Sequence, residues 1–180
     1  MNISIITINY NSSENTIKLL EALKNQTDKN FDVLVVDNNS EPDQKAILKS
    51  YRTEATNIVF IENNKNLGFS GGNNVGIKRA LANGTDWVLL LNNDTWVEND
   101  FISRLKASLD PSASSGQAPR NGIVGLAIDE GDRTTYAGKI EWLKPTLSHI
   151  PTSQVGYPQV YAIGGAMAIH KDVFDKIGFW

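Results

Sequence analysis

A short, uninterrupted apolar segment, residues 87–91, passes directly into the polar residues Asn92, Asn93 and Asp94. An apolar run of this length is typical of a strand that is buried on both faces, as in a parallel sheet. In such sheets, ligands bind at the carboxyl ends of the strands. Asp94 is therefore a candidate ligand for a hard metal ion that carries a diphosphate. The structural alternative is an Asx turn, in which Asp94 only ends the strand.

The size and charge of the chain limit the classes of protein that it can represent. Its 180 residues suit one domain with a sizeable core, and the net charge of −3 argues against a general nucleic-acid binder. The absence of cysteine excludes disulfides and thiolate metal sites. No apolar run approaches the roughly 18 residues of a membrane span, and the N-terminus lacks the basic region of a signal peptide. A cytoplasmic location is the default expectation.

Short apolar runs alternate with helical patterns over the first 109 residues, which predicts a mostly parallel central sheet flanked by helices. Strands are expected at residues 3–8, 31–36, 58–61 and 87–91, and helices at residues 12–26, 43–51, 74–82 and 100–109. Ser12 or Ser13 is expected to cap the first helix, and Asn83 with Gly84 to end the third.

The second half of the chain has a different, mixed pattern. Residues 110–121 are rich in Ser, Pro and Gly, which predicts an exposed loop. Strands are expected at residues 123–128, 134–142 and 160–169, and a helix at residues 171–177. Because no linker-like composition separates the halves, we predict a single α/β domain over residues 1–180.

Each of the four expected parallel strands is followed by polar residues, in segments 9–11, 37–40, 66–74 and 92–94. In a parallel sheet these segments lie along one edge, which would carry amides, hydroxyls and two carboxylates but no Lys or Arg. Asp37 suits a contact to a ribose or a base. Alternatively, Asp37 caps the following turn, with Ser40 as the helix cap.

Two glycine-containing segments are further candidates for the site. Residues 68–76 are dense in glycine and open a helix, so that backbone can approach an anionic ligand. They lack the spacing of a dinucleotide-binding motif and the lysine of a P-loop, and a tight structural loop is the alternative. Gly164 and Gly165 also permit a close approach, with a bulge or turn as the alternative. His170 follows this segment and is expected to serve packing or capping.

Taken together, these segments resemble the large inverting glycosyltransferase family that includes bacterial rhamnosyl-, galactosyl- and glucosyltransferases. The resemblance is carried by IITINYN at 5–11, VVDNNS at 35–40, NLGFSGGNNVG at 66–76 and LLNNDT at 90–95, in matching order and spacing. Residues 164–167 and 171–178 resemble a later segment of the family. This resemblance implies the GT-A (nucleotide-diphospho-sugar transferase) fold, a sugar donor activated by a nucleoside diphosphate, and a divalent cation, Mn²⁺ or Mg²⁺.

The resemblance also assigns roles to residues by position. Asn92-Asn93-Asp94 stands where many relatives have Asp-x-Asp, so Asp94 would be the main protein ligand for the metal, and Asn92 and Asn93 would belong to the nucleotide site. Gly164 and Gly165 would shape the sugar or acceptor side. The remaining nucleotide-binding residues would be Thr7, Asn9 and Asp37 around the nucleoside, and Asn66, Gly72 and Asn74 in the wall of its pocket.

The general base of the resembled family lies in an acidic motif that soon follows a segment like residues 176–180. We therefore expect residues 1–109 to be the nucleotide-sugar-binding half and residues 110–180 to be the incomplete start of the acceptor-side half. On this view the base is not in the chain, and the 180 residues bind donor but transfer weakly or not at all. None of the remaining acidic candidates matches the position of that motif; these are Asp129, Glu130, Asp132, Asp172 and Asp175.

The expected function is metal-assisted transfer of a sugar, with inversion, to a saccharide or lipid-linked acceptor, at the inner face of the membrane or in the cytoplasm, as in polysaccharide biosynthesis for a cell envelope. A non-catalytic nucleotide-sugar-binding module is the main alternative. A sugar nucleotidyltransferase is disfavoured because residues 9–14 contain neither Gly nor Lys. A phospho-accepting receiver domain is also disfavoured, because the chain shows neither the acidic pair after the first strand nor the lysine after a late strand that such a domain needs. The nucleotide, the sugar, the acceptor, the oligomeric state and peripheral membrane association are left open.

Overall fold

Four parallel strands form one side of the main six-stranded sheet, as the alternating pattern predicts. The computed structural model describes residues 1–51, 57–110, 122–126, 128–129, 134–135, 137–140, 147–150, 160–161 and 165–179. The four strands lie in the order β3-β2-β1-β4 and pair in parallel. Their carboxyl ends therefore meet at one edge of the sheet. Their bounds are β1 (Ile3–Asn9), β2 (Asp32–Asp37), β3 (Ile58–Glu62) and β4 (Trp87–Leu91).

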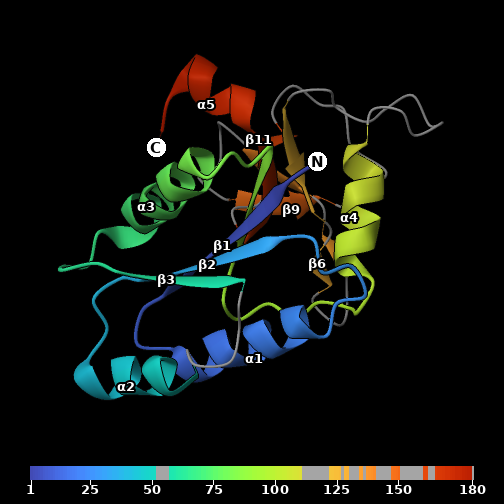
Figure 1. Cartoon of the computed structure of the whole chain (residues 1–180). Helices are drawn as coiled ribbons and strands as arrows, with labels where there is room; N and C mark the ends of the chain where they lie inside the picture. Colours follow the sequence, from blue (N-terminus) through green and yellow to red (C-terminus); the bar gives the residue numbers. More distant parts are fainter. Residues whose placement is uncertain are drawn as a thin grey trace.

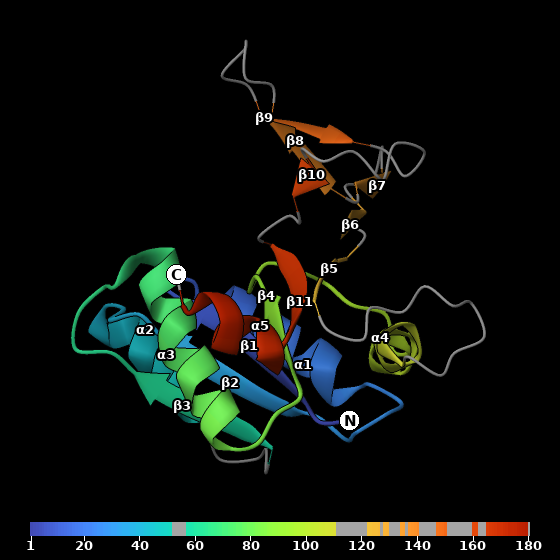
Figure 2. The ribbon, with the colours of Figure 1, turned by 90° about the horizontal axis from the view of Figure 1, so that it is seen from above.

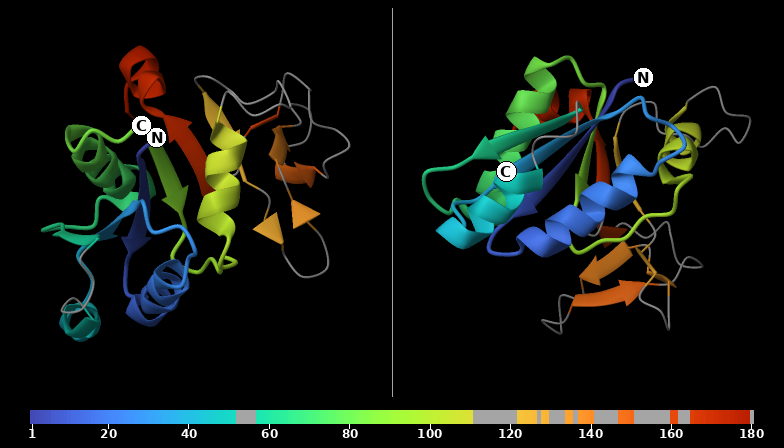
Figure 3. Two further views of the ribbon diagram at one scale, coloured as in Figure 1. Left: turned by 45° about the vertical axis from the view of Figure 1, so that its right-hand side comes forward. Right: turned by 60° about the horizontal axis from the view of Figure 1, so that its bottom comes forward.

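Helices cover both faces of this sheet (Figure 1, Figure 3). Successive residues of β1 point to opposite faces, so Ile5 packs with Leu20 and Leu105 on one face, whereas Ile6 packs with Ile77 on the other. The first face is covered by α1 (Ser13–Lys24) and α4 (Phe101–Leu109), with α2 (Pro42–Tyr51) beside α1. The second face is covered by α3 (Gly68–Ala82) and α5 (Lys171–Ile177).

The second half adds antiparallel strands to the same sheet. β11 (Ala166–His170) pairs with β4, and β5 (Ile123–Gly125) pairs with β11. Short strands form two small sheets that project beyond β5 and β11 (Figure 2). Within the described residues, the three strands predicted here are represented by shorter strands. The predicted loop at residues 110–121 lies outside the described residues except for Asp110. The small strands are β6 (Ile128–Asp129), β7 (Thr134–Thr135), β8 (Ala137–Ile140), β9 (Leu147–Ile150) and β10 (Val160–Tyr161).

Helix α3 begins six residues before its predicted start at residue 74. The chain turns into the helix at Gly68, whose φ is +71°, and continues through the glycine-rich segment. The predicted end is confirmed, because Asn83 caps α3 and Gly84 follows with a φ of +82°. Ser12 occupies the N-cap position of α1, but its side chain makes no capping hydrogen bond.

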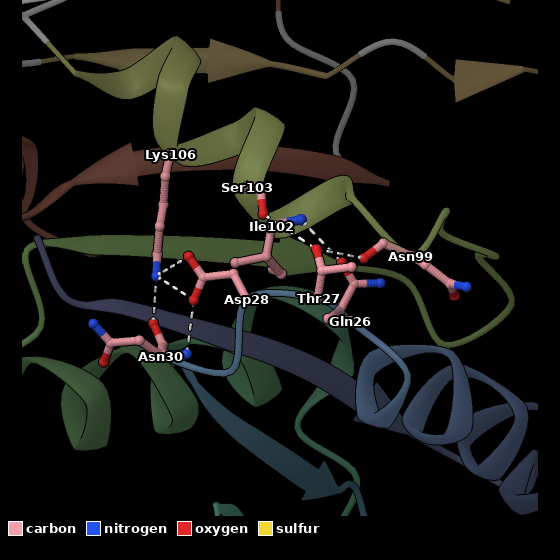
Figure 4. Close-up of polar contacts among 8 residues, drawn as sticks. All are labelled: Gln26, Thr27, Asp28, Asn30, Asn99, Ile102, Ser103 and Lys106. Carbon is pink, nitrogen blue, oxygen red and sulfur yellow. Dashed lines mark hydrogen bonds and ion pairs between the residues drawn. The ribbon is translucent and has the colours of Figure 1, made fainter.

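Gln26, which follows α1, fixes the start of α4 (Figure 4). Its buried amide accepts a hydrogen bond from the Ile102 backbone N–H at 3.0 Å and donates one to the Glu98 carbonyl oxygen at 2.7 Å. The N-cap residue Asp100 makes no capping hydrogen bond through its own side chain. A side chain distant in sequence therefore satisfies a free N–H of the first helical turn.

Among the described residues, no helix combines the length and the apolar character needed to cross a membrane.

Candidate functional site

An open cleft of about 240 Å³ lies at the carboxyl ends of β1 and β4 and against the first turns of α3. This is the edge of the sheet where the polar segments were predicted to meet. The predicted site residues Asn92, Asn93 and Asp94 all line it. The other lining residues are Ile8, Tyr10, Phe69, Asn73, Leu90 and Leu91.

Asp94 stands exposed at the polar end of this cleft. Within the described residues its carboxylate makes no hydrogen bond and no ion pair, so both oxygens are available to a ligand. The backbone N–H of Asn92 donates to the Gly165 carbonyl oxygen at 2.9 Å, and Thr95 N–H donates to the Asn92 carbonyl oxygen at 3.2 Å. An exposed carboxylate on a turn with fixed backbone fits a hard, oxygen-binding cation.

Asp94 lacks a set of further protein ligands in the part of the chain that the structure describes. No group of three or more His, Cys, Asp or Glu side chains gathers there in a metal-binding arrangement. A cation at Asp94 would therefore need oxygens from a bound diphosphate and from water. Mg²⁺ in particular is commonly held in this way, by one or two carboxylates together with phosphates.

Asn93 is tied to α1 on the far side of the turn. Its Nδ2 donates to Thr16 Oγ1 at 2.9 Å and lies 3.4 Å from the Ser12 carbonyl oxygen. Thr16 Oγ1 in turn donates to Asn9 Oδ1 at 2.8 Å. The segment that carries Asp94 is thus linked to the carboxyl end of β1 through a side chain of α1.

Asp37 and Asn9 lie at neighbouring strand ends but inside the protein. Asp37 is only 3% exposed, and Asn9 is completely buried. Asp37 Oδ1 accepts from Asn9 Nδ2 at 2.8 Å and from Ser40 Oγ at 2.6 Å, and Oδ2 accepts from Ser40 N–H at 3.1 Å. This geometry is that of a carboxylate holding a turn, the alternative considered from the sequence. Ser40 joins this cluster and does not cap α2.

Thr7 is also completely buried, on the face of β1 that α1 covers. Its Oγ1 has no hydrogen-bond partner among the described residues. The structure therefore brings Thr7, Asn9 and Asp37 to the predicted edge but not to the surface of the cleft.

Asn38 organises the predicted pocket wall around Asn66. Its Nδ2 donates to Asn66 Oδ1 at 2.8 Å and to the Gly68 carbonyl oxygen at 3.1 Å, and its Oδ1 accepts from the N–H of Leu67 at 3.0 Å and from Asn63 Nδ2 at 3.1 Å. One buried amide thus joins the end of β2 to the start of α3. Asn38 lies within the segment 35–40, but its sequence position alone does not indicate this role.

The other predicted residues lie near the cleft in different ways. Gly72 is buried, and a Cβ there would lie 3.2 Å from Ile8 Cδ1, which lines the cleft. Asn74 is half-buried on α3, next to the cleft residue Asn73. Gly165 is placed beside Asn92 by its hydrogen bond, whereas Gly164 lies outside the described residues.

A lysine does reach this edge of the sheet, contrary to the expectation from the strand ends alone. Lys45 on α2 places its Nζ 3.0 Å from Asn39 Oδ1. The four strand-end segments contain no basic residue, but a helix packed beside them supplies one. This edge of the sheet therefore carries a positive charge in addition to the amides, hydroxyls and carboxylates of the strand-end segments.

Two aromatic residues of the cleft were missed by the sequence analysis. Tyr10 is 50% exposed and Phe69 is 49% exposed, and both line the cleft. Tyr10 directly follows β1, and the chain turns immediately after it at Asn11, whose φ is +52°. An aromatic residue between a buried strand and a turn is a signal that sequence reasoning could have used.

His170 and the acidic residues of α5 lie at the opposite edge of the sheet. Because β11 runs antiparallel to β4, His170 pairs with Trp87 at the start of β4. Its ring lies edge-on to that of Trp87, and its Nδ1 accepts from the Asp172 N–H at 3.3 Å, which caps α5. These contacts agree with the packing and capping role expected for His170. They also place Asp172 away from the cleft.

Solved structures with the same arrangement define the class of fold. GalNAc-T7, crystallised with UDP, GalNAc and Mn²⁺, matches with a TM-score of 0.73 at 14% identity, over 100% of this chain and 37% of that one. The mannosyltransferase PcManGT from Pyrobaculum calidifontis, in complex with GDP-Man and Mn²⁺, matches with a TM-score of 0.66 at 14% identity, over 99% and 47%. The fold is therefore the GT-A fold of glycosyltransferases, as the sequence predicts.

The sequence model of Glycosyl transferase family 2 matches residues 4–178, and the chain belongs to this family. The dTDP-rhamnosyl transferase RfbF of Shigella flexneri is 24% identical over 98% of this chain and 56% of its own length. The chain spans about half the length of the curated relatives that it matches from end to end. The predicted glycosyltransferase family is thus confirmed.

Proposed function

We propose that this chain binds a nucleoside-diphosphate sugar in the cleft between β1, β4 and α3, together with Mn²⁺ or Mg²⁺. The protein would transfer the sugar, with inversion, to a saccharide or lipid-linked acceptor. One observation carries the proposal: Asp94 stands at the carboxyl end of β4, exposed, lining the cleft and without a partner among the described residues. Ligands of α/β sheets bind at such positions.

Asp94 would be the protein ligand of the cation. The flanking amides Asn92 and Asn93 are also oxygen donors, and oxygen ligands suit Mn²⁺ and Mg²⁺. When bound, the cation supplies positive charge that stabilises the diphosphate leaving group. The two structural neighbours named above, each crystallised with Mn²⁺, support this assignment.

The nucleotide would occupy the side of the cleft formed by Tyr10 and α3. Exposed aromatic rings can stack on the planar face of a base, and Tyr10 and Phe69 both present such rings. The first turn of α3 also directs backbone N–H groups toward its start, which favours an anion there. Asn9 and Asp37 would act from inside the protein, by holding the strand ends in place.

Sugar transfer requires a base to deprotonate the acceptor hydroxyl. Among the described residues that line the cleft, Asp94 is the only carboxylate, and the proposal uses it for the cation. We therefore expect donor binding to be measurable apart from transfer, and transfer by the 180 residues alone to be weak or absent. The same observation favours a second candidate function, a module that binds the nucleotide sugar without catalysis.

Calorimetric titration of the chain with UDP, GDP, dTDP and CDP, with Mn²⁺ and with EDTA, tests the proposal. We expect one of the nucleotides to bind with Mn²⁺-dependent affinity, and the Asp94→Ala variant to lose the dependence on Mn²⁺. Glu98→Ala is the matched control, because Glu98 is an exposed carboxylate after the same strand that does not line the cleft. Binding of none of the four nucleotides, or Mn²⁺-dependent binding that survives Asp94→Ala, contradicts the proposal.

A further inference from the structure

Thr16 carries a completely buried hydroxyl that bridges the carboxyl ends of two neighbouring strands, β1 and β4. It lies on α1 and contacts Asn9 at the end of β1 at 2.8 Å and Asn93 after β4 at 2.9 Å. No described side chain besides Thr16 hydrogen-bonds to both of these residues. Asn93 directly precedes the exposed carboxylate of Asp94.

The direction of each hydrogen bond in this cluster is fixed by Asp37. The oxygens of Asp37 accept from Ser40 N–H, from Ser40 Oγ and from Asn9, so Asn9 turns its Nδ2 toward Asp37. This leaves Asn9 Oδ1 facing Thr16, which therefore donates its single proton to Asn9. The remaining lone pairs of the Thr16 hydroxyl are then free to accept from Asn93 Nδ2. The chain of bonds from Asp37 to Asn93 thus has one consistent polarity.

The turn that carries Asp94 depends on this chain of bonds. Asp94 has no partner of its own among the described residues, so its position follows from the backbone of Asn92 and Asn93. The Asn92 backbone is held by Gly165, and the Asn93 side chain is held by Thr16 at 2.9 Å, with a longer contact to the Ser12 carbonyl oxygen. Partners that orient a metal ligand affect metal affinity strongly, although they do not touch the metal.

We propose that Thr16 is a positioning residue for Asp94, acting through Asn93, and that its hydroxyl sets the affinity of the site for the divalent cation. This inference rests on the proposed function, since it requires Asp94 to be the metal ligand. The inference extends the proposed metal site to Thr16 on α1, a residue that neither lines the cleft nor follows a strand of the sheet.

The test compares the Mn²⁺ affinity of three variants. The affinity is measured from the electron paramagnetic resonance signal of free Mn²⁺, in the presence of the nucleotide among UDP, GDP, dTDP and CDP that the unaltered chain binds. Thr16→Val keeps the shape but removes the hydroxyl, and should weaken Mn²⁺ binding by about tenfold. Thr16→Ser keeps the hydroxyl and should restore the affinity. Thr16→Ala is the second variant if Thr16→Val does not fold.

Ser13→Ala is the matched control. Ser13 Oγ belongs to the same buried cluster, at 3.3 Å from Asn9 Nδ2, and donates to the Gln44 carbonyl oxygen, but it makes no hydrogen bond to Asn93. Ser13→Ala should therefore lower the unfolding temperature without weakening Mn²⁺ binding. Equal Mn²⁺ affinities for Thr16→Val and Ser13→Ala, or a loss that Thr16→Ser fails to restore, would overturn the inference.

A double-mutant cycle locates the effect. If Thr16 acts through Asn93, the variant that combines Thr16→Val with Asn93→Ala should bind Mn²⁺ no more weakly than Asn93→Ala alone. Additive losses would contradict a route through Asn93. Asp94→Ala in the same series separates the two proposals: retained Mn²⁺ affinity in that variant overturns the metal site itself, whereas its loss together with a neutral Thr16→Val overturns only the role of Thr16.

Discussion

At the scale of single residues, Asp37 and Asp94 look alike in sequence and differ in the structure. Each is a carboxylate that comes after an apolar strand and lies next to a pair of asparagines. Asp37 is buried and held by Asn9 and Ser40, whereas Asp94 is exposed. The difference arises from partners on other segments, which periodicity and local motifs do not contain. The sequence therefore predicts that both carboxylates reach one edge, but not which of them faces the cleft.

Replacing Asp37 by Ala should mainly lower the stability of the fold, because Asp37 is buried and does not line the cleft. It leaves the Ser40 hydroxyl and the Ser40 N–H without their acceptor in a buried site, which costs about 1–3 kcal/mol of unfolding free energy. Urea unfolding measures this loss, with Asp32→Ala at the exposed start of β2 as the control. If nucleotide affinity falls while the unfolding free energy stays unchanged, then Asp37 contacts the nucleoside, as its position in the family motif implies.

At the scale of elements, α3 shows how packing overrides local propensity. Glycine is a poor helix former, so the pattern predicts a helix that begins only at residue 74, after most of the glycines. The structure continues the helix through them because α3 lies very close to β1. A Cβ at Gly76 would lie 2.5 Å from Ile6 Cγ2, so only glycine permits this approach.

Gly76→Ala should therefore destabilise the protein, although alanine is the better helix former. Overpacking of a tight core contact typically costs about 1–3 kcal/mol. Ser70→Ala is the control, because Ser70 is exposed on the same helix and gains the same kind of propensity without a new contact. The unfolding free energy from urea titration should fall for Gly76→Ala and stay the same or rise slightly for Ser70→Ala. A more stable Gly76→Ala variant would show that the helix can move away from β1 at little cost.

Helix α4 depends in a similar way on a residue outside it. Gln26→Leu removes the acceptor for the Ile102 N–H and the donor to the Glu98 carbonyl oxygen, and should cost about 1–3 kcal/mol because these groups are buried or partly buried. Amide hydrogen exchange at Ile102 should become faster. Thr27→Ala, which removes only exposed contacts, to the Asn99 carbonyl oxygen and to Ser103 Oγ, should leave that exchange rate nearly unchanged.

At the scale of the whole molecule, the sequence predicts the first half well and the second half poorly. Short buried strands that alternate with amphipathic helices specify β1 to β4 and their parallel direction, because each unit returns the chain to the same edge, but they do not give the order of the strands in the sheet. β11 joins β4 from far along the chain and runs antiparallel, so the contact of Gly165 with Asn92 could not be located from spacing. The cleft itself combines β1, α3 and β4, and its aromatic wall becomes visible only when these elements are packed together.

Two ion pairs connect distant segments and should make stability depend on pH in the acid range. Lys106 beside Asp28, and Lys171 beside Asp86, hold the pKa of each carboxyl below its ordinary value of 3.8. A carboxyl with a lower pKa in the folded state contributes stability above its unfolded pKa, and this contribution is lost as the pH falls through the folded pKa. Lys106 also donates to the Asn30 carbonyl oxygen at 2.8 Å (Figure 4).

Asp28→Asn should therefore lower the unfolding free energy at pH 7, and its difference from the unaltered protein should shrink as the pH falls below about 3.8. Asp86→Asn should follow the same direction with a smaller and more salt-sensitive effect, because the Lys171–Asp86 pair is more exposed, at 47% and 31% against 17% and 27% for Lys106 and Asp28. Urea unfolding from pH 7 to pH 3, at low and high salt, measures both differences. Asp100→Asn, in the highly exposed pair with Arg104, is the control and should change little at any pH. A difference for Asp28→Asn that grows as the pH falls would reverse the expected sign, and would mean that the neutral carboxyl, and not the carboxylate, is the form that the fold stabilises at this contact.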